Sequence, residues 1–194
     1  MKPIFTVHEG EYLVGAHLEQ TTDYNIWIPT KDTGEDMLVT NPDRTKNASI
    51  QVKFSKDFLV THNKPEMFDH ILCSGWWNLT PSKIKNSRAD LWVFVLFPFL
   101  RTEATRSGRQ NSSSNTQYVI VRPLDLYERL METQGNKSRF HVYLSISRNN
   151  NRCLQTRGLR ASNSYFVKDL PVEPARDFSE CLNNWQPLHE LLEA

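Results

Sequence analysis

The sequence predicts an α/β fold in which helices flank a mixed β-sheet. Three observations lead to this expectation: a proline-free segment of helical character near the N-terminus, several short segments rich in β-branched residues, and one apolar run, LWVFVLFPFL. That run spans residues 91–100, contains Pro98, and is too short for a bilayer-spanning helix, which needs about 20 residues. It therefore predicts a strand that is buried on both faces.

The first part of the chain predicts a helix followed by a meander of three strands. Residues 8–20 contain recurring apolar residues and no proline, which favours a helix. Residues 24–28 alternate between polar and apolar side chains and stop at a proline, which is typical of a strand. A turn leads to a second strand over residues 36–40, and a polar, hairpin-like connection leads to a third over residues 49–54.

The middle of the chain predicts the fourth, central strand over residues 90–97, inside the apolar run. Residues 65–72 open with a proline and favour a short helix. A second short helix is expected over residues 81–86, with Thr80 as its cap. Residues 102–116 contain no large apolar side chain, so a mobile loop is expected there.

The last part of the chain predicts further strands and helices of the same domain. Strands are expected over residues 118–121 and 140–146, with a helix over residues 124–133 between them. Residues 177–193 favour a helix interrupted at Pro187. With no internal repeat and no linker, residues 1–194 are expected to form a single domain around one sheet.

Charge is distributed unevenly, although the net charge of +1 by itself implies no partner. Residues 1–36 contain seven acidic and two basic residues, whereas residues 101–160 contain eleven basic and four acidic residues. Ten of those eleven bases are arginine, which suits forked contacts with phosphate. The alternative is a solvated surface that is basic without a function.

Cysteine content and the N-terminus together predict a reduced, cytoplasmic protein without a membrane segment. Three cysteines, Cys73, Cys153 and Cys181, lie far apart in the sequence and form no C-x-x-C pair. The N-terminal residues mix proline, histidine and glutamate with apolar residues, which is unlike a signal peptide.

A candidate site comes from the third expected strand. Gln51 and Lys53 are two residues apart, so they project to one face of that strand. Asp36 begins the neighbouring antiparallel strand, and its carboxylate can reach the same face across the ladder. The alternative interpretation is that Gln51 and Lys53 form the solvated face of an ordinary strand.

These residue types suit metal-assisted hydrolysis of a phosphodiester. Magnesium prefers oxygen ligands and retains several waters, so one or two protein carboxylates suffice to hold it. Asp36 would be the main ligand, the Gln51 carbonyl a second one, and Glu11 of the first helix a third, direct or through water. Lys53 would orient or help to deprotonate the attacking water and stabilise negative charge on the phosphate.

The segments E11-Y-L-V-G-A-H-L, D36-M-L-V and I-Q51-V-K53 resemble the restriction-endonuclease-like superfamily, whose motif is written PD-(D/E)xK. That superfamily has a glutamate on its first helix, an aspartate at the start of a core strand, and an acid-x-lysine on the next strand. Its DNA-cutting members bind Mg²⁺ and cleave phosphodiesters. The resemblance implies a restriction-endonuclease-like mixed β-sheet flanked by helices and a catalytic set of Glu11, Asp36, Gln51 and Lys53.

Two positions depart from the motif. Glu35 stands where the motif has proline, and Gln51 stands where it has an acid. Some catalytic members of the superfamily carry the same glutamine, so the substitution is compatible with activity. It also leaves open a descendant that has lost the site.

The basic second half is expected to grip DNA through arginine contacts with phosphates and base edges. The candidate DNA-binding residues are Arg106, Arg109, Arg148, Arg152 and Arg157. The pair Trp76–Trp77 has two interpretations, core packing, which is commoner, or stacking on bases.

These expectations combine into a Mg²⁺-dependent endonuclease that cuts DNA, with Mn²⁺ as a substitute ion. Residues 1–100 would form the catalytic core, and residues 101–194 an Arg-rich, DNA-gripping elaboration with a C-terminal helix. Many relatives cut both strands by pairing two sites, so a homodimer would follow. The alternative is a non-catalytic nucleic-acid-binding or assembly module that retains the fold.

Overall fold

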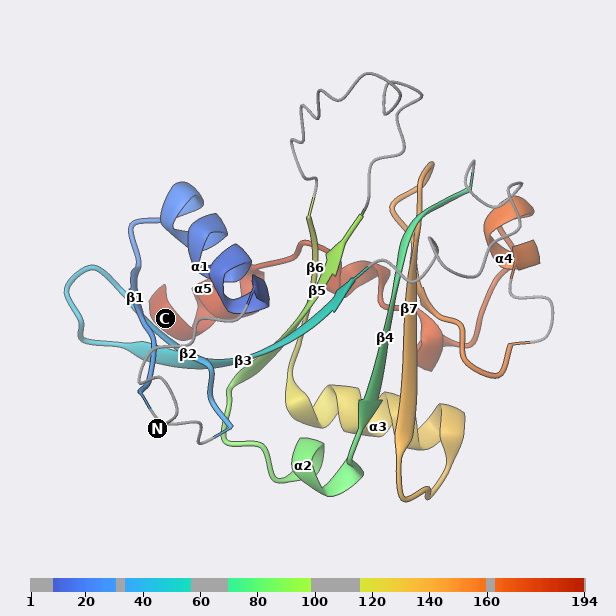
Figure 1. Ribbon diagram of the computed structural model, residues 1–194, viewed down its shortest axis with the longest axis horizontal. Helices are drawn as coiled ribbons and strands as arrows, with labels where there is room; N and C mark the ends of the chain where they lie inside the picture. Colours follow the sequence, from blue (N-terminus) through green and yellow to red (C-terminus); the bar gives the residue numbers. More distant parts are fainter. Residues whose placement is uncertain (1–8, 31–33, 57–69, 99–115, 160–162, 194) are drawn as a thin grey trace.

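Two β-sheets form the centre of the protein in the computed structural model, which describes residues 9–30, 34–56, 70–98, 116–159 and 163–193 (Figure 1). The larger sheet has five strands in the order β1-β2-β3-β5-β6 and the smaller has three in the order β4-β7-β8. The strands are β1 Asn25–Trp27, β2 Met37–Thr40, β3 Asn47–Lys56, β4 Ile71–Leu79, β5 Leu91–Phe97, β6 Gln117–Val121, β7 Phe140–Ser147 and β8 Cys153–Gln155.

Five α-helices and two short 3-10 turns complete the described part of the chain. The helices are α1 Glu9–Thr21, α2 Pro81–Lys85, α3 Pro123–Gln134, α4 Asn163–Val167 and α5 Gln186–Glu193. The 3-10 turns span Pro174–Arg176 and Ser179–Cys181. The protein is therefore a mixed α/β fold, as its sequence predicts. Among the described residues, no helix is long and apolar enough to cross a membrane.

The five-stranded sheet is mixed because its strands run in both directions. Strands β1, β2 and β3 form an antiparallel meander, β5 lies parallel to β3, and β6 lies antiparallel to β5. The connection from β3 to β5 passes through β4 and α2, so it leaves the sheet before returning to it. This detour positions β4 and α2 opposite β3.

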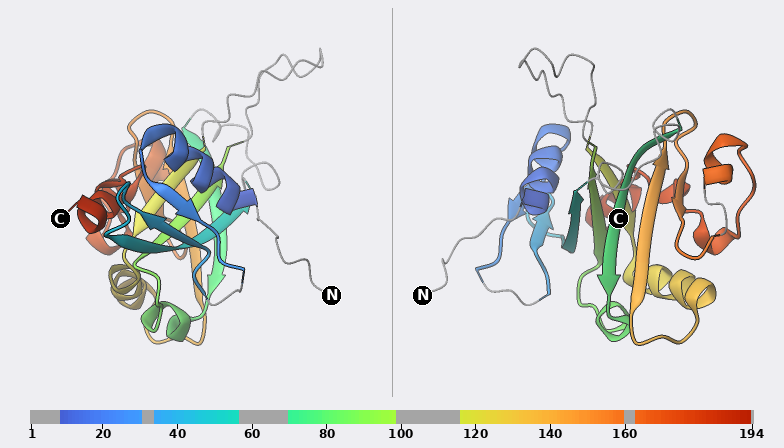
Figure 2. Two further views of the ribbon diagram at one scale, coloured as in Figure 1. Left: turned by 90° about the vertical axis from the view of Figure 1, so that its left-hand side faces the viewer. Right: turned by 45° about the vertical axis from the view of Figure 1, so that its right-hand side comes forward.

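One face of the five-stranded sheet packs on helices. Val14 and Leu18 of α1 and Leu188 of α5 contact a buried cluster that includes Ile50 and Val93. Figure 2 shows α1 on the side of this sheet away from β4 and β7. Val14 and Leu18 are four residues apart, so they lie on the same face of α1, and their burial against the sheet stabilises the helix there.

The other face of the sheet packs on the three-stranded sheet. Trp92 and Phe94 of β5 belong to a second buried cluster together with Trp77 of β4 and Val142 of β7. Alternate residues of β5 thus enter the two different cores, and every residue from Leu91 to Leu96 is buried. The prediction of a strand buried on both faces is confirmed.

Three sequence predictions about the fold are wrong. Residues 71 and 72 belong to β4 rather than to a helix over residues 65–72, of which residues 65–69 lie outside the described part. The strands form two sheets rather than one, because β4 pairs with β7 from much later in the chain. The helix expected over residues 177–193 begins only at Gln186, so Pro187 lies in the first turn of α5 and does not interrupt it, since a first-turn proline lacks only an N–H that would be unpaired anyway.

Candidate active site

Asp36 directly precedes β2 and is held by three hydrogen bonds to β3. Its backbone N–H donates to the Ile50 carbonyl at 2.9 Å. Its Oδ2 atom accepts a hydrogen bond from the Val52 backbone N–H at 2.7 Å and another from the Gln51 side-chain amide. The carboxylate is therefore fixed at the junction of β2 and β3, on the side of the sheet to which Gln51 projects.

Lys53 lies two residues after Gln51 on β3 and projects to the same face of the strand. Its Nζ atom lies 5.1 Å from the centre of the Trp92 ring, the neighbour of Gln51 across the parallel pair β3–β5. The Trp92 indole N–H donates to Ser87 Oγ at 2.9 Å, which fixes the plane of that ring. The face of the Trp92 ring therefore stabilises the Lys53 ammonium group through a cation–π interaction.

Glu11 reaches the same region from α1 because that helix approaches β3 closely. A Cβ atom at Gly10 would lie 2.7 Å from Phe54 Cβ and 3.2 Å from Val52 Cγ1, so only glycine permits this approach. Glu11 is the next residue and is only 8% exposed. A carboxylate at such a buried position is unusual unless it has a partner or a function.

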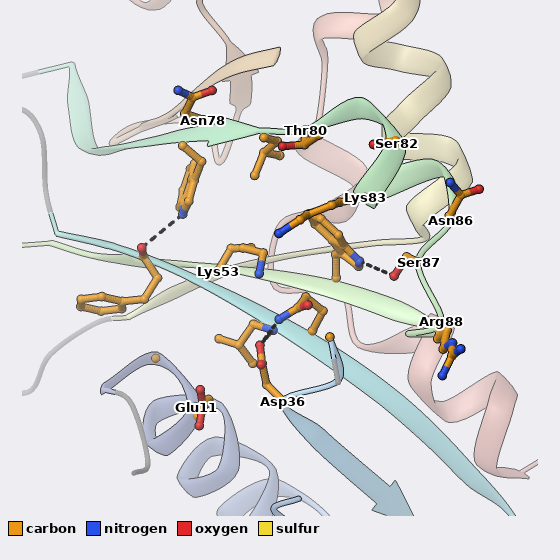
Figure 3. A pocket seen from close by; sticks show the side chains of 18 of the residues that line it. Glu11, Asp36, Lys53, Asn78, Thr80, Ser82, Lys83, Asn86, Ser87 and Arg88 are labelled. Carbon is orange, nitrogen blue, oxygen red and sulfur yellow. Dashed lines mark hydrogen bonds between the residues drawn. The ribbon is translucent and has the colours of Figure 1, made fainter. Parts of the chain in front are cut away.

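These side chains line one cleft, with a volume of about 1170 Å³, between the five-stranded sheet and the β4–α2 segment (Figure 3). The acidic residues in its lining are Glu9, Glu11 and Asp36. The basic residues are Lys53, Lys83, Arg88 and Arg139. In Figure 3, Asp36 and Glu11 lie on one side of Lys53, and Lys83 lies on the other side. The cleft thus has an acidic end and a cationic wall.

The structure brings together all four residues of the predicted catalytic set. Glu11, Asp36, Gln51 and Lys53 come from α1, the start of β2, and β3, and all of them line the cleft. The carboxylate of Asp36 and the ammonium group of Lys53 lie on the same side of the sheet.

Sequence reasoning missed Lys83 and Arg88, which lie on and directly after α2. The short helix was predicted, and the available signal was the series of basic residues on it and after it, Lys83, Lys85 and Arg88, just before β5. Arg139 belongs to the Arg-rich stretch over residues 101–160, so part of that stretch does meet the cleft.

Of the five arginines predicted to bind DNA, the three that the structure describes do not line the cleft. Arg106 and Arg109 lie outside the described residues. Arg148 is exposed, and Arg157 is exposed with its guanidinium carbon 5.4 Å from the centre of the Tyr143 ring.

Arg152 is engaged within the protein. Its guanidinium donates to Asp169 Oδ1 at 2.6 Å and to the carbonyls of Tyr165 and Leu170 at 3.3 and 3.0 Å. Arg152 therefore anchors the segment that contains α4 to the end of the three-stranded sheet.

The donor atoms of the cleft suit a hard cation. In the parts of the chain that the structure describes, no three His, Cys, Asp or Glu residues are grouped to hold a metal. Asp36 and Glu11 instead offer two carboxylates, which suffices for Mg²⁺ because that ion prefers oxygen ligands and retains several waters. The Gln51 side-chain amide donates an N–H to Asp36 Oδ2, so its oxygen becomes a ligand only after the amide group rotates by half a turn.

Comparison of the chain with protein-family models, with curated proteins and with solved structures gives no match.

Proposed function

We propose that the protein is a Mg²⁺-dependent endonuclease that hydrolyses DNA phosphodiester bonds and has a restriction-endonuclease-like fold. The observation that carries the proposal is the convergence of Glu11, Asp36, Gln51 and Lys53, from three separate elements, on one cleft. The cleft volume of about 1170 Å³ lies just above the range usual for small-molecule pockets and suits a larger substrate. Its cationic wall suits a polyanionic substrate.

The order of the elements supports the same proposal. An acid on the first helix, an aspartate at the start of β2, and Gln51-x-Lys53 on β3 follow the arrangement that the motif implies. The strands around them form a mixed sheet in which β3 is central and lies parallel to β5.

Each side chain would then have a separate role. Asp36 and Glu11 would hold the ion, with the Gln51 amide oxygen as a neutral third ligand. When bound, Mg²⁺ supplies charge neutralisation and makes water a stronger nucleophile. Lys53 would position the attacking water and stabilise the negative charge that develops on the phosphate. Lys83 and Arg88 would hold the flanking phosphates.

A second function is favoured by one specific contact. The Gln51 amide donates to Asp36 Oδ2, and with the Val52 N–H it satisfies that oxygen without a cation. A cleft whose carboxylate oxygen is already hydrogen-bonded in this way also suits a non-catalytic module that binds nucleic acid with its basic wall. Metal binding separates the two functions.

The test compares Asp36→Asn with a matched control, Asp90→Asn. Asp90 Oδ2 accepts a 2.7 Å hydrogen bond from the Ser49 backbone N–H, as Asp36 Oδ2 does from Val52, but Asp90 does not line the cleft. Mn²⁺ binding is measured by calorimetry. Cleavage of plasmid, single-stranded and branched DNA is measured with Mg²⁺ or Mn²⁺.

The expected result is that wild type and Asp90→Asn bind Mn²⁺ and cut DNA, whereas Asp36→Asn does neither. Binding of DNA without Mn²⁺ binding or cleavage would reject the nuclease and support the binding module. Loss of activity in both variants would show that the effect comes from weaker strand contacts rather than from the cleft.

A further inference from the structure

Two adjacent tryptophans of β4 have opposite environments. Trp77 is 7% exposed, packs edge-on against Phe94 at 4.9 Å between ring centres, and donates its indole N–H to the Phe54 carbonyl. Trp76 is 42% exposed and lies on the outer face of the three-stranded sheet. Core packing therefore accounts for Trp77 and leaves the exposed indole of Trp76 without a structural explanation.

Trp76 belongs to a strip of aromatic and basic side chains on that outer face. Tyr143 is its direct neighbour on β7, with ring centres 6.2 Å apart. The guanidinium of Arg157 lies 5.4 Å from the centre of the Tyr143 ring. We call Trp76, Tyr143 and Arg157 the outer aromatic strip.

The backbone beneath the strip is held in place. The Arg157 N–H donates to Gln155 Oε1 at 2.6 Å, and the Arg157 carbonyl accepts a 2.8 Å hydrogen bond from Arg176. The Trp76 N–H donates to Ser55 Oγ at 3.1 Å, next to the cleft-lining residues of β3. The side chains of the strip are therefore displayed from a rigid support.

The strip adjoins the cleft. Asn78, two residues after Trp76 on the same face of β4, lines the cleft, and so does Arg139, which directly precedes β7. In Figure 3, the Asn78 side chain lies on the side of β4 that faces away from Lys53, so Asn78 marks the place where the cleft borders the outer face of this strand. A chain leaving the cleft past Asn78 would meet Trp76 next.

We propose that the outer aromatic strip binds unpaired bases of the nucleic-acid strand whose backbone occupies the cleft. The inference rests on the proposed function and specifies its substrate class: DNA with a single-stranded segment beside the cut. Unpaired bases stack on exposed aromatic side chains whatever their sequence, and a nearby arginine adds cation–π and phosphate contacts.

Fully paired DNA fits this surface less well. Bases within a duplex stack on one another and present only their edges in the grooves, so a tryptophan on a sheet face cannot reach a base plane. The strip offers aromatic faces and a guanidinium, which is the combination found at sites that bind single strands without sequence preference.

The experiment measures binding by fluorescence anisotropy in EDTA, which prevents cleavage. The probes are a labelled oligothymidylate and a labelled blunt duplex of equal length. The variants are Trp76→Ala, Trp76→Phe and Arg157→Gln. The matched control is Trp27→Ala, because Trp27 is also exposed, at 45%, and also lies beside an arginine, Arg44, but on β1 at the far edge of the other sheet. Thermal unfolding of each variant checks that it is folded.

The expected result is a loss of oligothymidylate affinity of about tenfold in Trp76→Ala, since stacking on an aromatic side chain has about that value. Arg157→Gln should lose less, Trp76→Phe should retain most of the affinity, and duplex binding should not change. No loss in Trp76→Ala, an equal loss for the duplex, or an equal loss in Trp27→Ala would overturn the inference. Displacement of the oligonucleotide by polyglutamate would assign the strip to an acidic protein partner and overturn it too.

Failure of this inference is separable from failure of the proposed function. If the wild-type protein cuts DNA and the Trp76→Ala variant binds oligothymidylate as well as wild type does, only the proposal for the outer aromatic strip is contradicted. A protein whose single-strand binding depends on Trp76 but that cuts no DNA contradicts the nuclease alone.

Discussion

The two faces of the five-stranded sheet differ in how completely they are covered. The face that packs on α1 and α5 is continuous and apolar, and we call it the covered face. The opposite face packs on the three-stranded sheet around Trp92 and Phe94, but Gln51 and Lys53 on β3 line an open cleft, and we call it the cleft face. Strand β3 serves both faces, because alternate residues along it point in opposite directions.

This difference shows that one strand can contribute some side chains to the core and others to a site. Ile50 and Val52 hold β3 on the covered face, while Gln51 and Lys53 between and beyond them are available for a site. A substitution of Gln51 or Lys53 should therefore change function with little effect on folding, and the reverse should hold for the residues that pack on α1 and α5.

The largest effect is expected for Lys53→Met on the cleft face. Removal of a group that acts in proton transfer and charge stabilisation should lower the rate of DNA cleavage by about 10²–10⁴-fold. The matched control is Lys85→Met, because Lys85 also lies over an aromatic ring, Tyr127 at 5.7 Å, but outside the cleft lining. Similar rates for the two variants in a single-turnover assay would remove Lys53 from the catalytic set.

The next largest effect is expected for Leu18→Ala on the covered face. Leu18 is fully buried, so its truncation should lower the free energy of unfolding by about 2–5 kcal/mol. Leu38 is 38% exposed on the opposite face, and Leu38→Ala should cost about 0.5 kcal/mol or less. Urea denaturation measures both, and equal losses would contradict the assignment of the faces.

A smaller effect is expected for the cationic wall of the cleft. Lys83→Gln and Arg88→Gln should each reduce the slope of log affinity for DNA against log salt concentration by about 0.9, because each removes one phosphate contact. Lys85→Gln, on the same short helix but outside the cleft, should leave the slope unchanged. If the Lys85 variant reduces the slope as much as the other two, DNA binds to the general positive charge of this surface rather than specifically to the cleft.

The smallest effect is expected for His17, whose ring packs against both Tyr118 and Trp185, with ring centres 4.8 and 5.3 Å away. Burial lowers the pKa of His17 below its usual value of 6.5. Below pH 6.5 the unfolded chain therefore takes up this proton more readily than the folded chain, so the free energy of unfolding should decrease as the pH falls from 7.5. Thermal unfolding of wild type and His17→Gln measures this, and identical pH dependence would contradict it.

Much of the fold follows from local sequence pattern. The helix expected over residues 8–20 is α1, and the strand expected over residues 49–54 lies within β3. Strand β5 was predictable because it is apolar throughout, which is typical of a strand buried on both faces.

Strand β4 was not predicted because its sequence lacks a clear alternation of polar and apolar residues. Its inward residues Cys73, Gly75 and Trp77 differ greatly in size, and its outward residues include the large apolar Trp76, so alternation by hydrophobicity is weak. The pairing of β4 with β7 joins segments far apart in the chain, which no local pattern reveals.

The part of the candidate site that follows from local strand geometry was predictable. Gln51 and Lys53 share a face by strand geometry alone, and the position of Asp36 beside them follows from the hairpin of β2 and β3. Lys83 and Arg88 face the cleft only because the connection from β3 to β5 leaves the sheet through β4 and α2. That path depends on tertiary packing, which periodicity does not encode.

Gly75 and Trp77 constrain each other. A Cβ atom at Gly75 would clash with the six-membered ring of Trp77, and this ring cannot swing away because Phe94 and the Phe54 carbonyl hold it. Chains that share this architecture should therefore retain glycine wherever they retain the inner tryptophan, and lose both together. Gly-x-Trp on an edge strand thus provides a covariation signature for finding distant relatives of this protein.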